Sequence, residues 1–408
     1  MAIASLFRTP RFFGWHVVAA TFVLAVFGWG VGFYGPPIYL QMVVQRTGWS
    51  LALVSTAVTL HFLVGAAVVA NLPRLYRIYG VPLVTSIGSV LLAVGIVGWS
   101  LAYQPWHLFI AALLSGTGWV AMGAAAVNAL IALWCIRRRP AALSMAYNGA
   151  SVGGVLFSPL WVMLIASIGF AQAACTVGIV MVVVVAALSV LVFSKSPTGV
   201  GQFPDGEVVP EETPAAPTAS SRRRSLWRDR RFITLALAMA AGLFAQIGLL
   251  AHLFSIIVPV FGTKSAGLIM GGATVAAIAG RTGLGWLMPA NADRRLIASA
   301  SYGIQIIGSL TLLMSGQDYA PGIIVGVLLF GLGIGNATSL PPLIAQVEFN
   351  KADVSRVVPL IVAVSQATYA LAPAAFGAVR SYSDLYIFIF AAIVQGSAVV
   401  AFLYGRRR

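Results

Sequence analysis

The sequence predicts an all-α membrane protein, with twelve transmembrane helices in two six-helix bundles and both termini in the cytoplasm. Of its 408 residues, 60% are hydrophobic and only 9% are charged. The basic residues gather in alternate gaps between long apolar segments, and one long hydrophilic stretch lies near the middle of the chain. Together these observations are typical of a multi-pass membrane protein built from two halves.

Twelve apolar segments are each long enough to cross about 30 Å of hydrocarbon at 1.5 Å per residue. Their approximate spans are 13–41, 50–72, 80–102, 106–134, 141–166, 169–194, 232–261, 265–288, 295–316, 320–347, 355–379 and 383–405. The first segment is too long for the core of a signal peptide and is followed by no small-residue cleavage site, so we expect it to remain as the first transmembrane helix.

The distribution of charge sets the predicted orientation. Of the 25 Lys and Arg residues, 21 fall on one side of the twelve segments, and only Arg46, Lys264 and Arg380 fall on the other. Arg281 belongs to neither set. This bias follows the positive-inside rule and places the chain in the cell inner membrane with cytoplasmic termini. The net charge of +15 is spread over seven cytoplasmic segments, so it does not indicate nucleic-acid binding.

The hydrophilic stretch divides the chain. Residues 195–231 hold five prolines, an acidic cluster and a basic end, a composition that cannot bury a core. We therefore predict an N-terminal bundle (1–194), a flexible cytoplasmic linker (195–231) and a C-terminal bundle (232–408).

Several predicted helices carry prolines that remove backbone hydrogen bonds and bend the chain. The bends are expected at Gly35-Pro36-Pro37, Ser158-Pro159, Pro341-Pro342 and Ala372-Pro373. Bent helices of this kind often line a central path or act as gates, although each one can also be a static kink.

The junction between the fourth and fifth segments carries the most specific motif. It runs from Trp134 through a basic triplet, Arg137, Arg138 and Arg139, to Tyr147-Asn148-Gly149-Ala150-Ser151-Val152-Gly153. This resembles the signature of the monocarboxylate transporter family and the oxalate/formate antiporters, within the major facilitator superfamily. Six helices, a linker and six more helices is also that superfamily's architecture. The loop after the second helix departs from its usual pattern, because Arg77 stands where an aspartate is normal; Arg74 lies in the same loop.

Two parts of this motif have alternative interpretations. Gly149 and Gly153 lie about one turn apart on one helix face, which lets a neighbouring helix approach closely, either as static packing or as a contact that moves during transport. The basic triplet Arg137 to Arg139 either anchors the topology or takes part in gating by pairing with acids across the cytoplasmic face.

Substrate chemistry is expected from polar residues inside the segments, because such groups are costly in hydrocarbon. No Asp or Glu lies well inside any predicted helix, and Glu348 is the nearest. The candidate substrate-binding residues are Arg281, Asn148, Tyr147, Gln246, Tyr34, Asn336, Gln366, Tyr369 and Asn128.

Arg281 is the first of these candidates, because its planar guanidinium suits a carboxylate and keeps its charge. The resemblance implies the same role, since an arginine of the eighth helix binds the substrate carboxylate in that group. The alternative is a helix-end arginine tied to the tenth or eleventh helix. By the same resemblance, Gln366 replaces a second cation of the oxalate antiporters, which favours a monoanion.

His61 and His252 are the candidates for proton coupling, because histidine changes its charge near physiological pH. The other interpretation of each is a hydrogen-bonded packing residue.

We therefore expect a monomeric secondary transporter of a small organic anion, a monocarboxylate, working by alternating access with protons as a coupling ion. The alternative is a transporter of larger apolar molecules such as drugs or siderophores. A nucleotide-binding glycine loop and metal-ligand spacings are both absent from the sequence, so no enzyme activity and no cofactor are expected.

Overall fold

The computed structural model describes residues 12–69, 71–136, 138–206, 226–289, 292–316 and 318–406, and these form helices and connecting loops without a strand. The α-helices are α1 (Gly14–Gly32), α2 (Pro36–Thr47), α3 (Leu51–Val69), α4 (Leu72–Tyr79), α5 (Val81–Leu101), α6 (Pro105–Met122), α7 (Ala124–Trp134), α8 (Arg139–Ile168), α9 (Phe170–Leu188), α10 (Arg230–Leu287), α11 (Arg294–Ser315), α12 (Ala320–Glu348), α13 (Lys351–Tyr369), α14 (Ala372–Arg380) and α15 (Tyr386–Tyr404).

Within the described residues, eleven helical stretches are long and apolar enough to cross a membrane. One of them, Arg230–Leu284, is 55 residues long and contains the seventh predicted segment and most of the eighth. Its helix breaks at Gly262, whose φ of 73° and ψ of 163° suit only glycine. Thr234, near the start of α10, accepts a hydrogen bond from Arg295, which lies shortly after its end. Helix α10 therefore turns at Gly262 and returns to the side where it began.

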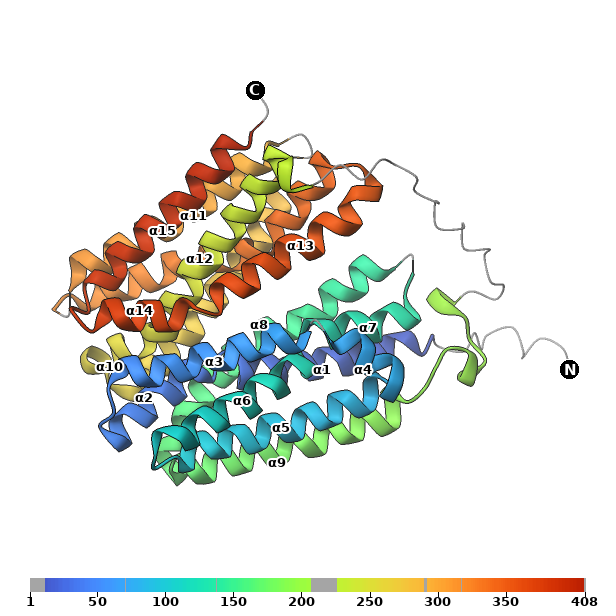
Figure 1. Ribbon diagram of the computed structural model, residues 1–408, viewed down its shortest axis with the longest axis horizontal. Coiled ribbons are helices and arrows are strands. Elements are labelled where there is room, and N and C mark those ends of the chain that lie inside the picture. Colours follow the sequence, from blue (N-terminus) through green and yellow to red (C-terminus); the bar gives the residue numbers. More distant parts are fainter. Residues whose placement is uncertain are drawn as a thin grey trace, which may run out of the picture.

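The helices form two groups, α1–α9 and α10–α15 (Figure 1). We call the side where α9 ends and α10 begins the linker side, and the opposite side the far side. Contacts between the groups join α8, α3 and α2 to α10, α13 and α14. In Figure 1 the groups meet near the labels of α2, α10 and α14 and diverge toward the linker side. The structure is therefore closed on the far side.

The bend between α1 and α2 leaves backbone carbonyls that other side chains satisfy. Pro36 has no N–H to give to the carbonyl of Gly32, and that carbonyl accepts instead from Nε2 of His61 at 2.9 Å. The hydroxyl of Tyr39 donates to the carbonyl of Val31 at 3.0 Å. Because a membrane interior offers little water, such partners make the break tolerable.

The paired glycines of the fifth predicted segment pack within one group of helices. A Cβ at Gly149 would lie 2.1 Å from the carbonyl oxygen of Phe22, and one at Gly153 would lie 2.5 Å from that of Val26, both on α1. This contact lies inside the first group, which favours static packing over a contact that moves between the groups.

The described part of the predicted linker, residues 195–206, packs on the first group. The carboxylate of Asp205 accepts hydrogen bonds from the backbone N–H groups of Ile136 and Arg138, at 3.1 and 3.2 Å. The side-chain oxygen of Gln202 accepts from the N–H of Phe13 at 2.9 Å. This part of the predicted flexible linker is thus held in place, and residues 207–225 lie outside the described residues.

Glu348 anchors the linker side of the second group. Its carboxylate oxygens accept from Nε and Nη2 of Arg295, at 2.6 and 2.8 Å, and the Arg295 side chain is only 1% exposed. Nearby, Asp229 caps α10 and accepts from Arg231, whose hydrogen bonds hold the pKa of the Asp229 carboxyl below its usual value.

We predict that Glu348→Ala destabilises the protein, because it leaves the buried guanidinium of Arg295 without its counter-ion. Breaking such a pair costs about 3–5 kcal/mol, which lowers the midpoint of thermal unfolding in detergent by roughly 5 °C or more. Arg406→Ala is the matched control, since it removes an ion pair to Asp293 whose partners are 39% and 38% exposed. Equal midpoints for the two variants would contradict this role of the pair.

Candidate functional site

Arg281 lies where α10 meets α12. Its Nε donates to the carbonyl oxygen of Gly335 at 2.9 Å, and a Cβ at Gly335 would lie 3.0 Å from the Cβ of Arg281. Nε is the only atom of this guanidinium with a hydrogen-bond partner among the described residues. Arg281 is therefore hydrogen-bonded through Nε to the tenth predicted helix. Its two terminal nitrogens remain available to a ligand.

Tyr34 brings the first group of helices to Arg281. The two side chains are close enough to interact electrostatically, and the Tyr34 hydroxyl also interacts with Thr274. A Cβ at Gly154 would lie 2.6 Å from the Tyr34 ring and 2.7 Å from Cγ2 of Thr274. Gly154 is therefore the point at which α8, α10 and the segment between α1 and α2 converge, because only glycine leaves room for them.

Tyr147 lies at the same depth as Arg281. It precedes Gly154 by seven residues on α8, and Arg281 follows Thr274 by seven residues on α10, so each is about 10 Å from their contact toward the linker side. Nδ2 of Asn128 donates to the Tyr147 hydroxyl at 2.7 Å. Asn128 and Tyr147 are both partly exposed.

The remaining predicted binding residues are more scattered. Asn148 is exposed and Gln366 is partly exposed. Gln246 is buried, and its side-chain oxygen has no hydrogen-bond partner among the described residues. Asn336 follows Gly335, but its Nδ2 donates to Ser301 at 3.2 Å inside the second group. Tyr369 faces Phe62 of the first group, with ring centroids 6.2 Å apart.

His61 has a partner for each ring nitrogen. Because the Gly32 carbonyl can only accept, Nε2 carries the proton and donates to it. Nδ1 then accepts from the hydroxyl of Ser115 at 2.8 Å, and Ser115 in turn accepts from Nε1 of Trp99 at 3.1 Å. All of these residues belong to the first group, so the geometry favours the packing role for His61.

His252 is placed differently. Its Nε2 donates to the carbonyl oxygen of Pro373 at 3.0 Å, whereas its Nδ1 is buried without a hydrogen-bond partner among the described residues. The space beside Gly377, where a Cβ would lie 3.4 Å from Cε1 of His252, is bordered by Ser55 of the first group. His252 therefore faces the seam between the two groups with one nitrogen free.

The cations of the predicted gating motifs lie on the linker side. Arg74 and Arg77 are exposed on the short helix α4, and Arg138 and Arg139 are exposed at the start of α8. Arg137 lies outside the described residues. The backbone of this loop is held by Asp205, which no motif in the sequence indicated.

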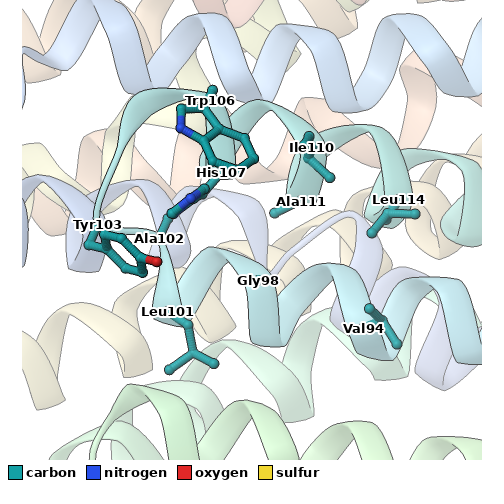
Figure 2. Close-up of a pocket in the computed structure, with 10 residues that line it drawn as sticks. All are labelled: Val94, Gly98, Leu101, Ala102, Tyr103, Trp106, His107, Ile110, Ala111 and Leu114. Carbon is teal, nitrogen blue, oxygen red and sulfur yellow. The ribbon is translucent and has the colours of Figure 1, made fainter.

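An apolar groove of about 270 Å³ lies between α5 and α6 (Figure 2). Tyr103, Trp106 and His107 border one end, with Val94 and Leu114 toward the other. None of the predicted binding residues lines this groove, so it is separate from the candidate site around Arg281.

Three residues where the two groups meet were not predicted from the sequence. Gly154 and Thr274 were overlooked because small and hydroxyl residues are common in spanning helices. The hydroxyl of Thr59 accepts from the N–H of Ala374 at 2.8 Å. Nothing in the sequence distinguishes Thr59 except its place two residues before His61.

The helices long and apolar enough to cross a membrane lie in two groups with Arg281 at the seam between them, an arrangement typical of multi-pass membrane transporters. The chain belongs to the Major Facilitator Superfamily, whose family model matches residues 18–373.

Individual relatives support this assignment. The chain is similar to human monocarboxylate transporter 11, with 24% identity over 350 residues that cover 80% of this chain and 68% of that protein. Two solved structures share the fold. A mutant form of the nucleoside transporter NupG gives a TM-score of 0.73 at 10% identity, covering 96% of this chain and 100% of that one. A D-xylose–proton symporter gives 0.71 at 14% identity, covering 96% and 97%.

We predict that His61→Leu lowers stability, because it leaves the Gly32 carbonyl buried without its partner, whereas the Ser115 hydroxyl keeps Ala112 and Trp99 as partners. One such unsatisfied group costs about 1–3 kcal/mol, so the midpoint of thermal unfolding should fall by several degrees. His107→Leu, at a partly exposed position, is the matched control. An unchanged midpoint for His61→Leu would show that the network is not structural.

Proposed function

We propose that this protein carries a small organic anion, a monocarboxylate, across the inner membrane by alternating access between bundles 1–194 and 232–408 joined by residues 195–231. The observation that supports this proposal most is Arg281. A guanidinium inside a spanning helix is costly unless it is paired, and this one lacks an acidic partner among the described residues. A carboxylate would supply the missing charge and bind both terminal nitrogens in a fork.

The proposed site places Arg281 of the second bundle and Tyr34 of the first against the substrate carboxylate, with Asn128 and Tyr147 of the first bundle at the depth of Arg281. An anion bound between residues of both bundles would couple their movement. If the linker side is cytoplasmic, as the distribution of charge predicts, the arrangement closed on the far side is an inward-facing state. The name of the human relative, a monocarboxylate transporter, agrees with this substrate class.

A second candidate is a transporter of larger apolar molecules. It is favoured by the ring contacts near the seam, where Phe62 lies 5.3 Å from Trp119 and 6.2 Å from Tyr369 between ring centroids. Such a carrier would not need the positive charge of Arg281.

We further propose His252 as the residue that couples transport to protons. His61 has no ring nitrogen free to take a proton without breaking a hydrogen bond, whereas Nδ1 of His252 has no hydrogen-bond partner in the part of the chain that the structure describes. The charged groups facing His252 are Arg380 and Asp384, which pair with each other at 2.6 Å. A proton on His252 would therefore lack a dedicated counter-ion in the closed state, so protonation would favour opening to water on the far side.

We predict that Arg281→Gln abolishes saturable uptake of monocarboxylates into proteoliposomes. Arg281→Lys keeps the charge but loses the fork, and we expect it to weaken affinity roughly tenfold to a hundredfold, as for loss of about 1.5–3 kcal/mol. Unchanged uptake by Arg281→Gln would reject the carboxylate site, and saturable uptake of an apolar solute by that variant would support the second candidate.

We predict that His252→Gln removes the stimulation of uptake by an acidic exterior while exchange of substrate at equal pH continues. Glutamine can still donate to the Pro373 carbonyl, so the backbone geometry should be kept. His107→Gln is the matched control, because it removes a histidine away from the seam. A His252→Gln variant that keeps the pH dependence of the unmodified protein would reject this assignment.

A further inference from the structure

The start of α14 is held by one side chain from each bundle. Helix α13 ends at Tyr369, and α14 begins at Ala372 with Pro373 in its first turn. The first N–H groups of a helix have no partner within it, and in a membrane they need one from elsewhere. The N–H of Ala374 finds this partner in the hydroxyl of Thr59, at 2.8 Å, from α3 of the other bundle.

The second support comes from the same bundle as α14. Nε2 of His252 donates to the carbonyl oxygen of Pro373, the residue immediately before Ala374. The freed N–H of Ala374 is therefore satisfied by a side chain, and the carbonyl beside it receives an additional donor. Only the Thr59 contact crosses between the bundles, joining residues 315 positions apart in the sequence.

One turn further along α14, the bundles meet without space for a side chain. A Cβ at Gly377 would lie 2.6 Å from Oγ of Ser55 and 2.7 Å from its Cβ. Ser55 lies four residues before Thr59, so the same face of α3 makes both contacts. Gly377 thus allows α14 to approach closely enough for Thr59 to reach Ala374.

We propose that Thr59 is a positioning residue of the transport cycle: its hydroxyl caps α14 across the seam and forms a latch, Thr59–Ala374, that keeps the far side closed. Opening on the far side separates α3 from α14, so the cap is lost and water must replace it. The latch therefore stabilises the closed state relative to the open one without touching the substrate. This inference depends on the fold and not on the identity of the substrate. Its test therefore does not depend on the carboxylate site.

The test measures how often the far side opens in the absence of substrate. Val58 is fully buried and borders a small apolar void between the bundles, together with Phe62, Ile247 and Leu250. In a background with Cys135→Ala and Cys175→Ala, a Val58→Cys reporter should react with a polar maleimide only when the bundles separate. The protein is held in lipid nanodiscs, and the rate of modification is followed by mass spectrometry.

We expect Thr59→Val to raise the rate of modification roughly fivefold, the effect of losing one hydrogen bond of typical strength. Thr59→Ser keeps the hydroxyl and should restore the original rate. Thr56→Val is the matched control, because the Thr56 hydroxyl is exposed and donates only within its own helix, to Ala52. An unchanged rate for Thr59→Val, or an equally raised rate for Thr59→Ser, would overturn the proposal.

A second variant tests the same latch through the other bundle. Gly377→Ala forces α14 away from Ser55 and should also raise the rate of modification, and adding Ser55→Gly should lower it again. A rate for Gly377→Ala equal to that of the unmodified protein would show that close approach at this point does not control opening, and would count against the latch.

Discussion

The need to pair every backbone polar group inside the membrane shapes most of this structure. Its helices break near Pro36 and Pro373, and each break releases groups that water cannot satisfy. The first break is supported within its own bundle by Tyr39 and His61. At the second, Thr59 of the other bundle accepts from a freed N–H, and His252 of the same bundle donates to the Pro373 carbonyl. The same requirement thus stabilises one bundle internally and links the two bundles on the far side.

Arg281 and two ion pairs near the ends of the second bundle lie in separate parts of the structure. The linker side holds the buried pair Arg295–Glu348, which fixes the ends of α10, α11 and α12 relative to one another. The far side holds Arg380–Asp384 near His252. Between them Arg281 has a single backbone contact among the described residues, through Nε. A charge whose remaining donors are unpaired, at the seam of two bundles, is a site where an anion gains most by binding.

The first bundle is also tied to the chain that connects it to the second. Asp205 adopts a φ of 60°, uncommon outside glycine, and in this conformation its carboxylate reaches two N–H groups of the loop before α8. That loop carries the basic triplet singled out in the sequence. The start of the linker is therefore hydrogen-bonded to the loop before α8, and we expect the two to move together.

The sequence by itself determined the membrane-spanning character, the superfamily and the candidate arginine, because hydropathy, charge bias and motifs depend on residues that are near one another in the chain. Twelve spans and cytoplasmic termini stay predictions, since the described helices include eleven candidate spans and α10 joins two predicted segments. Only the tertiary structure separated the two histidines, placed Gly149 and Gly153 inside one bundle, and revealed Gly154, Thr274 and Thr59. These outcomes depend on which distant helices meet and at what depth, and no local pattern encodes a hydrogen bond between residues 315 positions apart.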